Sequence, residues 1–360
     1  MHLSIPDFHI GIAQLRFESL HSPRMKVLFD HPDPFMLAHG GFQIQIEQSK
    51  SALESVGVDV EWLRWWDDAQ KGDLIHYFGR PNAAYLDFAQ DKGIRMVIAP
   101  LLTGMGSRSR PALLGQKIMT AILRRVLPGA FASAMGWEAF RRADACLALT
   151  AWQKHLMSRM FGAPPERVHV VPNGVEEIFF NAPAMARGRW LICTATLTAR
   201  KRVLELAEAA VRAQTPVWII GNAYAKTDPY ARRFFALAQQ HPDILRYEGP
   251  LSGREKLAQA YRQARGFVLL SSMESLSLSA LEAAACGCPL LLSDLPWARS
   301  TFGAAARYCP LTSSVGKTAA ILRAFYDAAP DLPPPPKPAT WMEIGQQIKT
   351  IYEQVLSTSR

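Results

Sequence analysis

The sequence has few cysteines and no long apolar run. Its 360 residues include five cysteines without a C-x-x-C pair, and Cys286 and Cys288 are too close together for an easy local disulfide. We therefore interpret all five cysteines as reduced and predict a cytoplasmic location. Charged or turn residues interrupt every apolar run before it reaches the ~18 residues that a membrane-spanning helix needs. These absences argue against a disulfide-stabilised domain and against a membrane-spanning one.

Two other patterns are missing near the N-terminus. The segment MHLSIPDFHIGIAQL lacks the basic start and long apolar core of a secretory signal. Residues 1–24 are predicted to be a loose extension, and Met25 begins the first strand pattern. No G-x-G-x-x-G follows that strand, which argues against a dinucleotide-dependent oxidoreductase.

The composition that remains is that of a globular protein with acidic partners. Apolar residues make up 49% of the chain and charged residues 20%, which suffices for a proper core, and the length suggests two domains. The formal net charge of +9 favours nucleotides, phosphorylated substrates, anionic lipid or nucleic acid as partners. Because no RNA or DNA module is present and the basic residues are scattered outside 105–142, we predict no nucleic-acid partner.

Strand and helix patterns alternate along the chain. Strands are predicted at 25–30, 58–63, 73–79, 95–100, 143–150 and 168–174, and again at 189–196, 216–221, 244–250, 266–272 and 289–294. Helices are predicted at 44–56, 151–161, 203–213, 229–240, 254–264 and 340–357. This alternation is typical of parallel, doubly wound sheets. We therefore predict an α/β fold of two lobes with a ligand cleft between them.

The domain boundaries follow from these patterns. Residues 1–24 form the extension, 25–182 the first lobe and 183–338 the second lobe, which ends in the proline-rich spacer DLPPPPKP. Residues 339–360 contain a last amphipathic helix with one apolar face.

The segment SSMESLSLSALEAAACGCPLLLSD (271–294) carries two glutamates with seven residues between them. Glu274 follows a predicted strand, at the edge of a parallel sheet where ligands bind. Serines at the start of the next helix can cap it, and its free N–H groups can hold an anion. Glu282 lies among alanines and leucines, where a buried carboxylate is costly unless it is paired. Two ribose hydroxyls could pair with it; the alternative is an exposed glutamate that faces solvent.

Glu274, Glu282 and the CGCP turn resemble the E-x7-E signature of retaining glycosyltransferases of the GT-B fold, in the GT4 group (glycosyl transferases group 1). The resemblance covers most of residues 25–357. It implies two Rossmann-like lobes that face a cleft, and a C-terminal helix that crosses back to the first lobe. It also implies transfer of a sugar from a nucleotide-diphosphate sugar to a hydroxyl of a glycan, a lipid-linked molecule or a small molecule, with no metal and no further cofactor.

The same resemblance implies roles for individual residues. Glu274 binds the donor sugar, Lys201 holds the diphosphate and Glu282 binds the ribose. The donor-binding set is Gly40, Gly41, Arg200, Lys201, Glu274, Ser275, Leu276, Ser277 and Glu282, of which Glu274 and Lys201 are the catalytic residues. The family's arginine position falls on Thr196, a departure for which Arg200 or Arg202 could compensate.

A second departure lies on the acceptor side. Many relatives have a histidine after the strand that corresponds to 95–100, whereas this chain continues PLLTGMG. His39 and His76 are the candidate substitutes, and the alternative is that each is an ordinary cleft or core histidine. The segment VVPNG (170–174) resembles the family's connection between the lobes, and we interpret its Asn-Gly turn as architectural.

Residues 105–142 contain seven lysines or arginines, one acid (Glu138) and many apolar side chains. Such a stretch can lie on an anionic membrane surface, and a peripheral location at the cytoplasmic face of the membrane is therefore a hypothesis. It could equally line the acceptor side of the cleft, or be a helix that packs one face and exposes the other.

Two other functions remain open. A nucleotide-sugar 2-epimerase would need its own acid and base residues in the cleft, and no convincing set is present. A degenerate GT-B lobe pair that binds nucleotide sugars without turnover is favoured only by Thr196.

Overall fold

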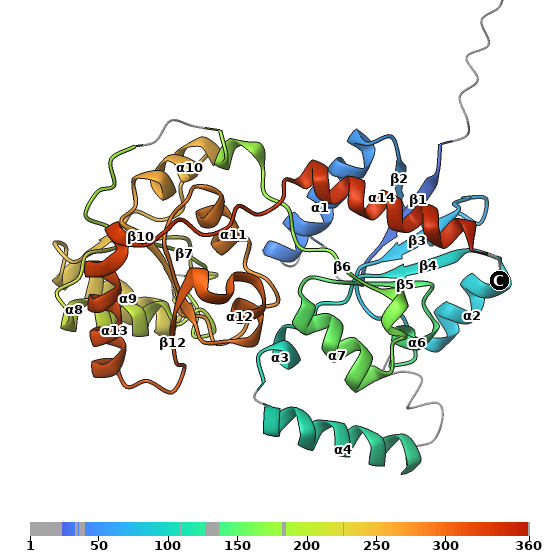
Figure 1. Ribbon diagram of the computed structural model, residues 1–360, viewed down its shortest axis with the longest axis horizontal. Coiled ribbons are helices and arrows are strands. Elements are labelled where there is room, and N and C mark those ends of the chain that lie inside the picture. Colours follow the sequence, from blue (N-terminus) through green and yellow to red (C-terminus); the bar gives the residue numbers. More distant parts are fainter. Residues whose placement is uncertain are drawn as a thin grey trace, which may run out of the picture.

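The computed structural model describes residues 24–32, 35, 40–108, 110–126, 137–181, 185–225 and 227–358. They form two α/β lobes, each built on a six-stranded parallel sheet with helices on both faces (Figure 1). The predicted extension lies outside the described residues except for residue 24. The two-lobe α/β prediction is confirmed.

The first sheet has the strand order β2-β1-β3-β4-β5-β6. Its strands are β1 (Lys26–Asp30), β2 (Asp59–Trp62), β3 (Leu74–Tyr77), β4 (Arg95–Ile98), β5 (Ala145–Ala148) and β6 (Val168–Val170). Its helices are α1 (Gly41–Ser55), α2 (Ala83–Asp91), α3 (Thr103–Gly106), α4 (Arg110–Val126), α6 (Ala139–Arg142) and α7 (Ala151–Phe161). Strand β1 pairs in parallel with both β2 and β3, as expected for a doubly wound sheet.

The second sheet has the strand order β12-β11-β10-β7-β8-β9. Its strands are β7 (Leu191–Thr194), β8 (Val217–Ile220), β9 (Leu245–Tyr247), β10 (Gly266–Leu269), β11 (Leu290–Ser293) and β12 (Ala306–Cys309). Its helices are α8 (Val203–Arg212), α9 (Pro229–Gln240), α10 (Arg254–Gln263), α11 (Leu278–Ala285), α12 (Pro296–Phe302) and α13 (Val315–Ala328). The strand order reverses between β7 and β10, and such a reversal is where open α/β sheets bind ligands.

The central strands of the second lobe have the sequence pattern expected of buried parallel strands. Strands β10 and β11 are buried along their whole length, and buried parallel strands appear in a sequence as short continuous apolar runs. The helix between them, α11, begins at the N-cap Ser277, whose hydroxyl accepts a hydrogen bond from the Ala280 N–H at 3.3 Å. Glu274 is thereby placed on the loop between β10 and α11.

The last helix, α14 (Trp341–Ser357), returns from the second lobe and packs on α1 in the first (Figure 1). Ile344, Ile348 and Tyr352 are buried in one core cluster with Val27 of β1. The segment that connects the two lobes is hydrogen-bonded to the segment before α14, because the Val175 N–H donates to Ala339 O at 3.0 Å. The predicted crossing helix is confirmed.

Two glycines permit this crossing. A Cβ on Gly174 would lie 2.6 Å from Trp341 Cα, and a Cβ on Gly345 would lie 2.8 Å from the Ala52 backbone. The Asn-Gly turn of the connection is therefore architectural, as interpreted. Within the part of the chain that the structure describes, no helix is both long enough and apolar enough to cross a membrane.

Candidate donor site where the lobes meet

The side chains of Lys201 and Glu274 meet at the point where the strand order of the second sheet reverses. Lys201 lies on the loop after β7 and Glu274 on the loop after β10. Lys201 Nζ lies 2.5 Å from Glu274 Oε1, and Ser271 Oγ donates to the same oxygen at 2.6 Å. Arg200 Nη1 is 3.5 Å from it. Glu274 is only 8% exposed, so its charge is matched by two cations and a hydroxyl rather than by water.

The backbone of Arg200 joins the two loops that carry this pair. Arg200 O accepts hydrogen bonds from the Ser272 N–H at 2.8 Å and from Ser272 Oγ at 3.1 Å. Arg200 Nη1 in turn donates to Met273 O at 3.0 Å. The site is therefore fixed by main-chain contacts as well as by charge.

Arg202 does not take part in the pair. Its backbone is left-handed (φ 53°), an unusual conformation for a residue with a side chain, and it is the N-cap of α8. Its Nη1 donates to Leu311 O at 3.1 Å, away from Glu274. Of the two candidates to compensate for Thr196, the structure therefore favours Arg200.

Two helix N-termini come together at the same place. Gly40 is the N-cap of α1, and a Cβ on Gly41 would lie 3.6 Å from Leu278 Cδ1 at the start of α11. The start of α1 in the first lobe thus lies against the start of α11 in the second. Helix N-termini favour anions because their first N–H groups have no partner within the helix.

Hydroxyl groups of the first lobe contact the loop that carries Glu274. Thr103 Oγ1 is 2.5 Å from Ser275 Oγ, and Ser107 Oγ accepts from the Glu274 N–H at 3.3 Å. Gln153 Nε2 donates to Ser275 O at 3.4 Å. The segment that lacks the family's histidine therefore contributes hydroxyls to the site. Leu276 is buried in the core of the second lobe, so only its backbone is available to a ligand.

Glu282 is buried as the first interpretation requires, but it is not alone. Arg254 Nη2 lies 2.6 Å from Glu282 Oε1, and the Tyr261 hydroxyl donates to Oε2 at 3.2 Å. Arg254 also pairs with Glu176 of the connection, Nε to Oε2, at 3.0 Å. Burial raises the pKa of Glu282, and Arg254 opposes that rise. The solvent-facing alternative is therefore wrong, and the buried carboxylate already has two protein partners.

Two family models match successive parts of the chain. Residues 50–177 match Glycosyltransferase Family 4, and residues 175–317 match Glycosyl transferases group 1. The two matches meet at the connection between the lobes. The chain belongs to the GT4-like glycosyltransferases.

Relatives of this glycosyltransferase agree with the assignment. It is 28% identical over 170 residues to D-inositol 3-phosphate glycosyltransferase of Acidothermus cellulolyticus, in a match that covers 41% of this chain but only 38% of that relative. Its fold is similar to sucrose-phosphate synthase from Thermosynechococcus elongatus (TM-score 0.63, 16% identity, 93% of this chain and all of that one). It is also similar to Anabaena HepE in complex with UDP and glucose (TM-score 0.59, 15% identity, 92% and 100%). These likenesses show the GT-B fold across both lobes.

Of the two histidine candidates, His76 does not reach the site. His76 is 1% exposed, and its Nδ1 is 2.6 Å from the Tyr352 hydroxyl of α14, so the structure corrects its proposed acceptor-side place to the core. Burial lowers its pKa to about 3, which keeps the ring neutral. His39 lies outside the described residues. Within the described ranges, no group of three or more His, Cys, Asp or Glu side chains is placed to hold a metal ion.

Five residues of the candidate site were not predicted from the sequence. They are Thr103, Ser107, Arg254, Tyr261 and Ser271. Thr103 and Ser107 lie more than 160 residues from the glutamate loop that they contact. Only Ser271, three residues before Glu274, had a local signal, because a hydroxyl at the end of a strand is close to the next loop.

Proposed function

We propose that this glycosyltransferase is a retaining, metal-independent enzyme that transfers a sugar from a nucleotide-diphosphate sugar to a hydroxyl acceptor. The acceptor is a glycan, a lipid-linked molecule or a small molecule, and no further cofactor is needed. The observation that carries the proposal is the pair of Lys201 and Glu274 at the strand-order reversal. A donor can contact both side chains at once, with its diphosphate on the Lys201 ammonium and its sugar hydroxyls on the Glu274 carboxylate. HepE, solved with UDP and glucose, supports this donor class.

The positive charge needed by a leaving diphosphate comes from the protein itself. Lys201 and Arg200 bring two cations, and the N-termini of α1 and α11 bring unpaired N–H groups. Fixed donors of this kind stabilise charge that develops on the leaving group without a metal ion. Gly40 and Gly41 let the diphosphate approach the backbone of α1 closely.

We propose a front-face displacement as the chemical step. The bond between the anomeric carbon and the phosphate oxygen breaks, and the bond to the acceptor oxygen forms on the same face. The acceptor's proton passes to the leaving phosphate oxygen, so no side chain acts as a nucleophile. Glu274, held by Lys201 and Ser271, orients the sugar and favours positive charge at the anomeric carbon.

We assign the ribose to Glu282. In the structure both of its oxygens have protein partners, so nucleotide binding requires Arg254 or Tyr261 to release one oxygen or to share it. Arg254 is the partner that can move, because its side chain is 37% exposed whereas Tyr261 is fully buried.

Stereochemistry tests the proposed reaction without knowledge of the acceptor. The protein is incubated with UDP-, GDP-, ADP- and dTDP-sugars, and slow hydrolysis of the donor is followed by proton NMR. A retaining enzyme releases the sugar first with the anomeric configuration of the donor, and Glu274→Gln abolishes the release. Initial release of the opposite anomer contradicts retention, and activity that depends on added divalent metal contradicts the metal-independent mechanism.

Thr196 supports a second candidate, a glycosyltransferase-like protein that binds nucleotide sugars without turnover. The family's arginine position brings no charge in this chain. Donor binding by calorimetry, combined with no hydrolysis and no transfer to a broad acceptor panel, would favour this candidate.

We also propose a cytoplasmic location with peripheral contact between 105–142 and an anionic membrane. All five cysteines are free and four are buried, which supports a reducing compartment. The basic and apolar character of 105–142 supports the membrane contact.

A further inference from the structure

Helix α4 exposes a continuous apolar stripe. Leu114, Ile118, Ile122 and Val126 recur every four residues, and Met119 lies beside them. Each of the five side chains is between 54% and 75% exposed. Residues four apart lie on one face of a helix, so these side chains form a single surface. A surface helix of a globular protein ordinarily turns such a stripe toward the core.

The opposite side of α4 already packs on the first lobe. Leu113 is 6% exposed and belongs to the core cluster that contains Ile75 of β3 and Leu156 of α7. The helix is therefore docked by one side while its larger apolar side faces outward. Figure 1 shows α4 as the outermost helix of the first lobe, on the side of α3 and α7. A large exposed apolar surface of this kind marks an interaction site.

Positive charge borders the stripe. Helix α4 contains four basic residues and no acidic one. One of them, the exposed Lys117, lies three residues after Leu114 and so borders the stripe. An apolar face bordered by lysine and arginine is the pattern of helices that lie in the plane of an anionic bilayer surface. Two copies of α4 placed face to face would bring like charges together, so charge complementarity favours lipid over a second copy.

The loop before α4 links this surface to the candidate catalytic residue. Ser107 accepts a hydrogen bond from the Glu274 N–H, and α4 begins only three residues later at Arg110. A partner surface that binds α4 therefore lies close to the part of the site that the first lobe contributes.

We propose that the exposed face of α4 docks the protein on an anionic lipid bilayer and brings the acceptor side of the site to the membrane surface. This inference deepens the proposed function by assigning its membrane contact to one face of one helix. The stripe inserts at the level of the headgroups, and the positive charge of α4, with Lys117 beside the stripe, meets anionic headgroups.

Vesicle sedimentation tests the proposal on the full chain. Vesicles of phosphatidylcholine alone are compared with vesicles that also contain about one third phosphatidylglycerol, because lysine and arginine favour an anionic surface. We expect the protein to pellet with the anionic vesicles and not with the neutral ones. We expect Ile118→Ser/Ile122→Ser to weaken this binding at least about tenfold, because two apolar side chains leave the interface. Lys117→Glu should weaken it by several-fold, and added salt should do the same.

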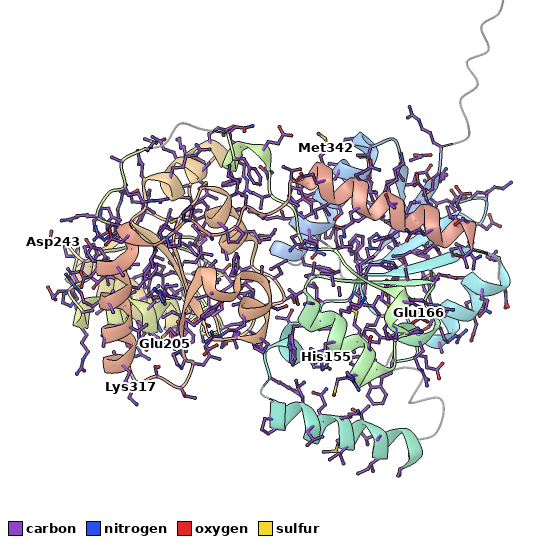
Figure 2. The ribbon with its side chains drawn as sticks, in the orientation of Figure 1. His155, Glu166, Glu205, Asp243, Lys317 and Met342 are labelled. Carbon is purple, nitrogen blue, oxygen red and sulfur yellow. The ribbon has the colours of Figure 1, made fainter. Side chains whose placement is uncertain are left out.

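Matched control variants make similar substitutions elsewhere on the surface. They distinguish a specific effect of the α4 stripe from a general effect of removing exposed apolar side chains or changing charge. Phe88→Ser/Met342→Ser removes two exposed apolar side chains outside α4; Met342 lies on α14, across the first lobe from α4 (Figure 2). Lys317→Glu makes the same charge change on α13 of the second lobe (Figure 2). Both controls should bind anionic vesicles as the parent protein does.

Three results overturn the proposal: no pelleting with anionic vesicles, equal pelleting of the Ile118→Ser/Ile122→Ser variant, or a dimer in sedimentation velocity that this variant dissolves. The last result would assign the stripe to a second copy of the chain. Thermal stabilisation by nucleotide sugars is measured on the same variants and should be unchanged. If the α4 variants lose lipid binding but keep donor binding, the result concerns the α4 surface and leaves the proposed function untouched. If neither the parent protein nor any variant binds a donor, the result contradicts the proposed function and leaves the α4 surface untouched.

Discussion

Arg254 Nη2 lies 2.6 Å from Glu282 Oε1 and so connects the start of α10 to the middle of α11. Through its Nε the same guanidinium reaches Glu176 in the connection between the lobes. The carboxylate that we assign to the ribose is thus already engaged, and its partner also touches the connection. The proposed ribose site and the connection between the lobes therefore share the side chain of Arg254.

Removal of Arg254 should destabilise the protein in a pH-dependent way. Arg254→Ala leaves Glu282 buried with only Tyr261 as a partner, at a cost of about 1–3 kcal/mol, less than for a fully buried pair because Arg254 is partly exposed. Burial already raises the pKa of Glu282 above 4.5, and loss of the cation raises it further. The folded variant then binds more protons than the unfolded chain above about pH 4.5, so its stability falls as pH rises.

Urea unfolding at about pH 5 and about pH 7.5 measures this effect. The loss in Arg254→Ala should be larger at the higher pH. Arg323→Ala, which breaks the exposed pair with Asp327, is the matched control and should cost less than about 1 kcal/mol at either pH. Equal losses at both pH values would show that Glu282 does not depend on Arg254 for its charge.

The ribose assignment of Glu282 predicts a selective loss of nucleotide affinity. Glu282→Gln should weaken binding of the preferred nucleoside diphosphate about 10- to 100-fold, the usual effect of losing hydrogen bonds to a charged group. Calorimetry with the 2′-deoxy nucleotide isolates the contact, because that ligand should bind the parent and the variant with a smaller difference. Equal losses for both nucleotides would place Glu282 away from the 2′-hydroxyl.

His76 should make the fold sensitive to mild acid. Its pKa in the folded protein is about 3, against 6.5 for an unperturbed histidine, because it is buried. Below about pH 6.5 the unfolded chain binds a proton at this histidine and the folded chain does not. The free energy of unfolding therefore decreases as the pH is lowered, by about 2 kcal/mol at about pH 5. In the stability–pH profile, His76→Gln should flatten this fall. His155→Gln, at an exposed position on α7, should not (Figure 2).

The contact between α1 and α14 should tolerate no added methyl group at Gly345. A Cβ there would lie 2.8 Å from the Ala52 backbone, so Gly345→Ala should cost about 1–3 kcal/mol through forced separation of the helices. Gly115→Ala is the matched control inside helix α4, where a Cβ meets nothing within 4 Å, and it should stabilise by about 0.5–1 kcal/mol. Thermal unfolding measures both effects. Melting temperatures that shift in opposite directions, down for Gly345→Ala and up for Gly115→Ala, would support the close crossing of α1 and α14, and shifts in the same direction would contradict it.

Local patterns predicted most of the fold. Strands such as β10 and β11 are short apolar runs between turn signals, and α14 has one apolar face, so their positions needed no knowledge of distant contacts. Strand β12, with the sequence ARYC, was missed because an edge strand with an exposed arginine lacks that pattern. Helices α12 and α13 were likewise not predicted from the sequence.

The candidate site was only half accessible from the sequence. The spacing of Glu274 and Glu282 and the position of Lys201 are local features that a family resemblance captures. The Arg254–Glu282 pair and the contacts of Thr103 and Ser107 form between segments that are distant in the sequence. No local sequence pattern predicts such contacts. Burial of His76 under α14 was hidden for the same reason, since its partner Tyr352 lies 276 residues later.

The pair of Lys201 and Glu274 forms the proposed donor site, and donor binding tests this assignment most directly. Isothermal titration calorimetry of the parent protein, Lys201→Ala and the matched control Lys317→Ala is carried out with UDP-, GDP-, ADP- and dTDP-sugars. We predict that one donor class binds the parent and the control equally, and that Lys201→Ala binds it at least about 100-fold more weakly, because the diphosphate loses its main cation. Equal donor affinity of Lys201→Ala and the parent would contradict the placement of the diphosphate, and with it the donor site at this pair.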